Sequence, residues 1–210
     1  LHKQGYDEIE VLNYDEEQFA IIEDLVLHLF IGFIVKEQSR LRIVIGQVAM
    51  VDAKEFDATL RRAFRLMDSS MSELVAAFKE KDAALLARQV EAEHDNNKLT
   101  NFCERLLNKN LAQKDKGHFW YVVAWNLEKI VDNFKYIAQH YGAQVPAVGD
   151  EIVDLMQGVH TYMRGYYEVF YDFSFERLTG LSGQKKALEA DVQRLLRSEE
   201  RRVGKECATG

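Results

Sequence analysis

The chain has 210 residues, of which 47% are hydrophobic and 29% are charged, and it contains a single proline. This composition is typical of a soluble, mostly helical protein with one domain or two small ones, and it argues against a disordered chain. A formal net charge of −7 disfavours a surface that binds nucleic acid, although a small basic patch could lie within that total. The two cysteines, Cys103 and Cys207, form neither a disulfide framework nor a paired metal site, which fits a reducing cytoplasm. No apolar run reaches the roughly 18 residues expected of a membrane span.

The first fifty residues predict a small α/β linker domain. Apolar and acidic residues alternate over 8–11 as in a short strand, and Asp15 is placed to cap a helix that runs to Leu29. Two stretches rich in Ile, Val and Phe follow, 33–38 and 41–48, and they predict a hairpin with Ser39-Arg40 as its turn. We therefore expect a β-α-β-β unit. Because the chain begins with Leu rather than Met, we interpret this domain as incomplete.

From Asp52 onward, apolar residues recur at alternating steps of three and four, which predicts long amphipathic helices. The first helix carries an apolar stripe made of Leu60, Phe64, Met67, Met71, Leu74 and Phe78. A second helix runs to about Asn108. The third has the most regular stripe, made of Trp120, Val123, Leu127, Ile130, Phe134, Ile137 and Tyr141. These helices predict an antiparallel three-helix bundle over 52–142, and the fold class is mainly α with a small α+β domain in front.

Two further helices are expected after the bundle, as a partial second repeat over 146–196. The fourth helix has its apolar stripe at Ile152, Met156, Val159, Met163, Tyr166, Phe170 and Phe173. We expect Gly180 and Gly183 to end it, and a short fifth helix to follow from Leu188 to Leu196. Residues 197–210 continue no pattern and resemble translated vector or adaptor sequence, so we interpret them as a non-native tail. The alternative is a charged native tail.

An almost wholly polar block lies at 91–98, in the middle of the second helix. Burying unpaired carboxylates would cost several kcal/mol, so this block either faces solvent or finds partners inside the bundle. Glu91 and Asp95 are one helical turn apart, as are Glu128 and Asp132 on the next helix, and each pair could share a cation or an arginine. Five acidic pairs have this spacing in the chain, about the number expected by chance. Only the placement of the first two pairs on consecutive antiparallel helices favours a metal site over a solvated face.

A family resemblance begins in the third helix. The run from Leu127 to Asp132, LEKIVD, followed by Tyr136-Ile137-Ala138, resembles the signature helix of PhoU-type phosphate uptake regulators. The stretches 5–10 and 31–37 are similar to the linker domain of archaeal-type PhoU proteins that carry an AbrB-like DNA-binding hairpin, and 96–108 is similar to their second bundle helix. The resemblance covers most of the chain up to Tyr141, and the DNA-binding hairpin is missing from these residues.

The resemblance implies a cytoplasmic, non-enzymatic PhoU-domain regulator of phosphate uptake and phosphate signalling. Its partners would be the phosphate transporter's ATPase or a sensor kinase, it would form a homodimer, and DNA would be bound only through the missing domain. Because Glu-x-x-x-Asp motifs can hold metal ions in this family, the candidate ligands for iron, manganese, magnesium or zinc are Glu91, Asp95, Glu128 and Asp132. We expect no catalytic residues and no other cofactor.

Two other functions stay open at this point. Glu91-x-x-His94 matches half of a ferritin-like di-iron constellation, so an enzyme could be built on Glu91, His94, Glu128 and Asp132. That fold needs the motif twice, and the chain has it once. The third reading is a metal-free dimerisation scaffold in which the polar block faces water.

Overall fold

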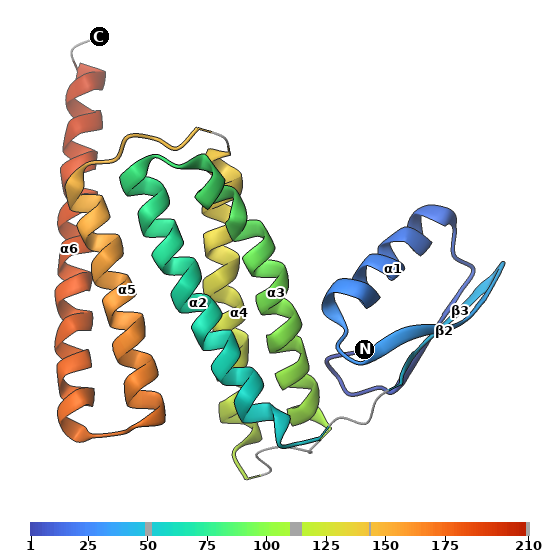
Figure 1. Cartoon of the computed structure of the whole chain (residues 1–210). Helices are drawn as coiled ribbons and strands as arrows, with labels where there is room; N and C mark the ends of the chain where they lie inside the picture. The colour runs from blue at the N-terminus through green and yellow to red at the C-terminus, as the bar shows by residue number, and fades with distance from the viewer. Residues whose placement is uncertain (49–51, 110–114, 143, 209–210) are drawn as a thin grey trace. The chain divides into compact units, whose positions relative to one another are not determined.

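The computed structural model describes residues 1–48, 52–109, 115–142 and 144–208, with side chains as far as Ser198. The elements, in chain order, are β1 (Glu8–Leu12), α1 (Glu16–Leu29), β2 (Phe33–Ser39), β3 (Arg42–Gln47), α2 (Glu55–Glu80), α3 (Ala83–Asn108), α4 (Gly117–Tyr141), α5 (Asp150–Tyr171) and α6 (Phe175–Ala208) (Figure 1). The expected class, a mainly helical chain with a small sheet, is confirmed. In these ranges no helix has both the length and the apolar character needed to cross a membrane.

By its internal contacts the chain divides into two compact units. The first contains Leu1–Ser70 and Ala87–His140, and the second contains Met71–Leu86 and Tyr141–Gly210. The sheet, α1, the first part of α2, most of α3 and nearly all of α4 therefore belong to one unit. The second unit holds α5, α6 and the loop end of the α2–α3 pair. The domain boundaries given above follow sequence motifs instead, and they stay a prediction.

The sheet is antiparallel with the order β1-β3-β2, so that the β-α-β-β prediction is confirmed. Its core is apolar and lies against α1: Ile9, Val26, Phe33, Ile43 and Ile45. Ser39 pairs with Arg42, so the hairpin turn is Arg40-Leu41, and the predicted turn at Ser39-Arg40 was wrong by one residue. The turn was misplaced because no turn-forming glycine marks it, and the alternation of side chains between the two sheet faces did not specify the pairing register of β2 and β3.

Helix α1 begins where the sequence predicted. Asp15 accepts a hydrogen bond from the Gln18 N–H at 2.8 Å, and the Gln18 side chain accepts one from the Asp15 N–H at 3.2 Å. This reciprocal capping box satisfies two N–H groups that have no partner inside the helix. The prediction that Asp15 caps the helix is confirmed.

The apolar stripes predicted for α2 and α4 are largely buried. All six predicted stripe residues of α2 are buried, and Leu127 and Phe134 of α4 are buried as expected. The buried face of α4 is turned slightly from the predicted one, because Ala124 and Val131 are buried while Ile130 and Ile137 are only half-buried. The rings of Phe56 and Trp120 meet edge to face at 5.8 Å between centroids, which joins the beginnings of α2 and α4.

A buried arginine of α3 joins the sheet to the helices of the first unit. Arg105 of α3 is 1% exposed and lies 4.7 Å from the centre of the Phe33 ring. Its guanidinium donates four hydrogen bonds, to the carbonyls of His2 (2.9 Å) and Tyr6 (2.7 Å) and to the side chains of Asp7 (2.5 Å) and Gln47 (2.8 Å). Four of its five possible N–H donors are therefore used, which is what burial of a guanidinium requires.

In the second unit, α5 and α6 form a helical hairpin, and two predictions about it were wrong. Helix α5 ends at Tyr171, and Gly180 and Gly183 lie inside α6 rather than ending a helix. Ser174 caps α6, accepting a hydrogen bond from the Arg177 N–H at 3.1 Å. A glycine inside a helix costs only about 1 kcal/mol relative to alanine, which a helix of this length can tolerate.

A glycine on α5 leaves room for a leucine side chain of α6. A Cβ added at Gly158 would lie 2.8 Å from Cδ2 of Leu188, too close for two carbon atoms. The small residue therefore leaves room for the Leu188 side chain between α5 and α6. The backbone of α6 stays helical to Ala208, so the fifth helix is much longer than the predicted 188–196 and runs into the predicted tail. Whether residues 197–210 are native stays a prediction.

Candidate functional site

Helix α3 presents a stripe of polar side chains to the interior of the first unit. Gln89, Glu93, Asn96, Thr100 and Glu104 are all buried. They follow one another at steps of three or four residues, and so lie on one face of the helix. The amide of Asn96 donates to the Leu127 carbonyl of α4 at 3.3 Å, which shows that this face meets α4. Apolar side chains normally fill such positions, so the polar groups need partners inside the bundle.

Lysines of α4 supply partners at one level of the stripe. The Lys135 ammonium is 2.7 Å from Glu93 and 3.8 Å from Asp132, and the Lys129 ammonium is 2.6 Å from Asp132 and 3.3 Å from Glu128. Burial acts to raise the pKa of Asp132, but the hydrogen bond and charge of Lys129 outweigh it and hold that pKa below its usual value. Asp132 is therefore ionised at neutral pH.

A lysine near the N-terminus pairs with the carboxylates in the next part of the stripe. The Lys3 ammonium is 2.7 Å from Glu128 and 3.2 Å from Glu104. Burial acts to lower the pKa of Lys3, but the hydrogen bond to Glu128 and the two carboxylate charges raise it above its usual value. Together, Glu93, Glu104, Glu128 and Asp132 with Lys3, Lys129 and Lys135 form what we call the buried polar seam.

Glu104 is the least compensated member of the buried polar seam. Its side chain is fully buried, and neither carboxylate oxygen accepts a hydrogen bond of good geometry within the described residues. Burial raises the pKa of Glu104 above its usual value, and the nearby Lys3 charge offsets this only in part. Ionisation of Glu104 therefore lowers the stability of the folded state.

The four predicted metal ligands are not equivalent in the structure. Glu128 and Asp132 are buried, 9% and 7% exposed, and belong to the buried polar seam, while Glu91 and Asp95 are exposed on α3. Among the described residues there is no group of three or more His, Cys, Asp or Glu side chains placed to hold a metal ion. The described donors therefore do not fit a metal centre, and the metal site stays a prediction.

The same arrangement of side chains bears on the alternative of a di-iron enzyme. Glu91 and His94 are both exposed, whereas Glu128 and Asp132 are buried and paired with lysines. A di-iron centre needs carboxylates from facing helices to project toward one another. The structure brings Glu128 and Asp132 together but leaves the α3 half of the constellation on the outer surface.

Sequence reasoning missed Glu93, Glu104 and the lysines. A signal for Glu93 was present, because Leu86, Gln89, Glu93, Asn96, Thr100 and Cys103 continue one another at steps of three and four. Extending the apolar phase of Leu86 through the polar block selects Glu93 and rejects Glu91 and Asp95. No comparable signal pointed to Lys3, which lies 125 residues from Glu128 in sequence.

Comparisons with protein-family models, with curated proteins and with solved structures find no match to this chain. The resemblance to PhoU-type proteins therefore rests on the motifs quoted above, and the functional argument rests on the geometry of the residues.

Metal should have little effect on the stability of the protein. The lysines already neutralise Glu128 and Asp132, and a cation would have to displace Lys129. After chelator treatment, iron, manganese, magnesium or zinc should shift the thermal melting temperature by no more than about a degree. A real site saturated at about a hundred times its Kd would instead add about 2.7 kcal/mol. A shift that disappears in the double variant Glu128→Ala, Asp132→Ala would restore the predicted metal site.

Replacing Glu104 with glutamine should change how stability depends on pH. Because the folded state raises the pKa of Glu104, it holds that proton more tightly than the unfolded chain does. The parent should therefore lose stability as pH rises through the raised pKa, and the variant should lose less. Lys3 keeps Glu128 as a partner in the variant, so its cost at neutral pH should stay within about 1 kcal/mol. Urea melts from pH 5 to 9 measure this, and parallel curves for the two proteins would contradict it.

Proposed function

We propose that this chain is a non-enzymatic regulator of phosphate uptake and phosphate signalling, of the PhoU type, which works in the cytoplasm through contacts with other proteins. The observation that carries the proposal is an exposed apolar face on α4. Phe119, Val122 and Trp125 follow at steps of three and are 54%, 55% and 46% exposed. Aromatic and apolar side chains gathered on one exposed helix face are typical of protein interfaces.

The buried polar seam supports a structural role for the carboxylates. A catalytic carboxylate must reach its substrate, but Glu93, Glu128 and Asp132 are buried and each is held by a lysine. Such ion pairs give a helix pair a defined register more readily than they give it stability. We infer that the buried polar seam fixes α3 against α4 so that the outer face of α4 is presented in one arrangement.

A metal-free dimerisation scaffold is the second candidate, favoured by one observation. The three lysines stand where cations would be needed to relieve repulsion between the carboxylates. On that reading the same α4 face would contact a second copy of the chain. The two candidates differ in the occupant of the face, and an experiment can separate them.

The test measures binding of the full chain to two purified proteins, the ATPase of a phosphate transporter and the cytoplasmic part of a phosphate sensor kinase. We expect one of them to bind and Val122→Glu to weaken binding at least about tenfold, because a charge would be buried at the interface. Val48→Glu is the matched control, since Val48 is 57% exposed and lies after β3. Phosphate uptake in cells that lack their own PhoU-type protein gives a second readout.

Binding to neither protein, together with unchanged phosphate uptake, would contradict the regulator proposal. If the chain is a dimer that Val122→Glu converts to a monomer while neither partner binds, the scaffold function is correct instead. Equal effects of Val122→Glu and Val48→Glu would mean that the α4 face is not the contact surface.

A further inference from the structure

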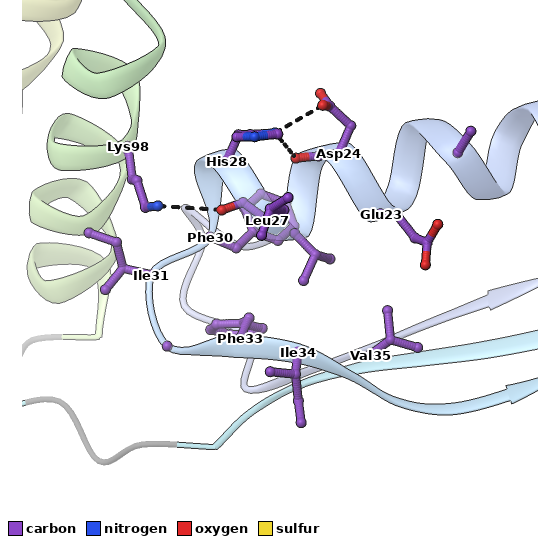
Figure 2. Close-up of a pocket in the computed structure, with 13 residues that line it drawn as sticks. Glu23, Asp24, Leu27, His28, Phe30, Ile31, Phe33, Ile34, Val35 and Lys98 are labelled. Carbon is purple, nitrogen blue, oxygen red and sulfur yellow. Dashed lines mark hydrogen bonds and ion pairs between the residues drawn. The ribbon is translucent and has the colours of Figure 1, made fainter.

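A groove of about 870 Å³ runs between α1 and β2 in the first unit (Figure 2). Its lining is mostly apolar and includes Val26, Leu27, Phe30, Phe33, Ile34 and Val35. Leu27, whose side chain lines the groove, is 68% exposed. Large apolar side chains that line an open groove mark a binding surface more often than scattered single residues do.

The groove borders an open strand edge. The order β1-β3-β2 leaves one edge of β2 without a strand partner within the described residues. Figure 2 shows Phe33 and Val35 pointing toward α1 and Ile34 pointing to the opposite side. An added strand would alternate in the same way, placing every second side chain in the groove and the others beside Ile34.

Only part of that edge is suited to pairing. A bulge interrupts the β2–β3 register between Val35 and Glu37, and Lys36 at this point is exposed. Bulges and charged residues are the usual means by which proteins block strand edges. The stretch of β2 from Phe33 to Val35, which lines the groove, has neither, and of its groups the Phe33 N–H is already bonded to the Phe30 carbonyl at 3.3 Å. The edge is therefore blocked where there is no groove and open where there is one.

Charge indicates what kind of strand would bind. Residues 1–48 contain nine acidic and four basic side chains, a formal charge of −5. Glu23 and Asp24 line one side of the groove, and Asp24 is paired with His28 at 2.9 Å, while Glu23 is exposed. Lys98 of α3 lines the groove at the Leu27 carbonyl, to which its ammonium donates at 3.4 Å, so the basic side chain of a bound strand is expected at the Glu23 end. A basic side chain beside Glu23 would be favoured by both the local carboxylate and the field of the domain. A second copy of the chain would bring an equally acidic domain to the groove.

We propose that this groove and the adjoining edge of β2 bind an extended segment of a partner protein, which adds a fourth strand to the sheet. An apolar side chain of that segment enters the groove against Leu27 and Phe30. A lysine or arginine two residues away lies on the same side and reaches Glu23. This interaction goes beyond the proposed contact on α4 and does not depend on it.

The probe is the blocked peptide TKVLVKT, added to the full chain. Its sequence reads the same in both directions, so it presents a leucine flanked by two lysines on one side whether it pairs parallel or antiparallel to β2. We expect it to bind and to slow hydrogen exchange of amides between Phe33 and Val35. The same peptide methylated on its three central backbone nitrogens should not bind, because a strand needs those N–H groups to pair.

Matched variants test the two recognition elements. Leu27→Lys should weaken binding of TKVLVKT at least about tenfold, whereas Ile21→Lys should change it less than about twofold. Ile21 is the control because it is 54% exposed on the same helix and does not line the groove. Glu23→Lys should weaken TKVLVKT and strengthen the acidic peptide TEVLVET, since both the protein and the peptide charge are reversed.

Several outcomes would overturn the proposal. They are an absence of TKVLVKT binding up to about 1 mM, undiminished binding of the methylated peptide, and equal losses in Leu27→Lys and Ile21→Lys. Sedimentation of the parent protein gives a fourth contradicting outcome. This outcome is that the parent self-associates, that Leu27→Lys makes it monomeric, and that TKVLVKT does not prevent the self-association. A second copy of the chain would then occupy the groove instead of a basic partner strand.

Discussion

Replacing Arg105 with methionine should lower the free energy of unfolding by about 3 kcal/mol. Methionine fills similar space but offers no donors, so the four hydrogen bonds of the guanidinium are lost. The carbonyls of His2 and Tyr6 and the side chain of Gln47 each lose a donor, although the His2 carbonyl keeps its bond from the Gly5 N–H at 3.0 Å, and each lost hydrogen bond costs about 1 kcal/mol. The ion pair with Asp7 adds little, because the Asp7 side chain is 61% exposed. Urea melts of the two proteins at neutral pH measure the difference.

Arg42→Met is the matched control for this variant. Arg42 also contacts two carboxylates, those of Glu10 and Glu37, but all three side chains are well exposed. Exposed ion pairs contribute about 0–1 kcal/mol, so the control should be nearly neutral. Equal costs for the two variants would mean that Arg105 does not fasten the sheet to α3, and hydrogen exchange of the β3 amides would show whether the sheet loosens first.

Sequence periodicity predicted the elements whose neighbours are close in the chain. The α2 stripe from Leu60 to Phe78 was correct because steps of three and four place residues on one helix face whatever surrounds the helix. The Asp15 cap was correct because capping depends only on the next three residues. Register was harder, and the hairpin turn was displaced by one residue because Arg40-Leu41 carries no turn signature.

The helix ends of the second unit were wrong for a different reason. Gly180 and Gly183 are helix breakers by intrinsic propensity, yet both lie within α6. The observed break lies at residues 172–174, and the Ser174 hydroxyl caps the start of α6 by accepting a hydrogen bond from the Arg177 N–H. Packing overrode local propensity here, because Leu181, between the two glycines, is buried and lies against α5 at Gly165.

The candidate site shows the same division between local and long-range information. The spacing of Glu128 and Asp132 could be read from sequence, and both are buried as the bundle face requires. Their partners could not be predicted from sequence, because Lys3 lies 125 residues from Glu128 and is brought next to it only by the tertiary structure. The motif spacing directed attention to Glu91 and Asp95, while the phase of the helix places Glu93 inside. Helix phase was the better guide to burial, and motif spacing alone carries no information about which face is inside.

Replacing Phe134 with alanine should cost about 3–5 kcal/mol, the range found for buried phenylalanines. Phe134 is 6% exposed and shares the buried face of α4 with Leu127, Val131 and Ala138, so removing its ring leaves a cavity in the core. Tyr136→Ala is the control on the same helix. Its ring is 56% exposed, although Lys135 lies 5.0 Å from the ring centre, so its loss should cost less than about 1 kcal/mol.

The comparison also tests which force holds α4 in place. Suppose that Phe134→Ala lowers the free energy of unfolding by less than about 1 kcal/mol, while Glu104→Gln or Lys135→Met lowers it by more. The ion pairs, and not the apolar face, would then hold α4 in place. We expect the opposite order, because buried ion pairs lose most of their attraction to desolvation, whereas a buried ring loses both its transfer energy and its contacts when it is removed. Denaturant melts of the three variants in one buffer give that order directly.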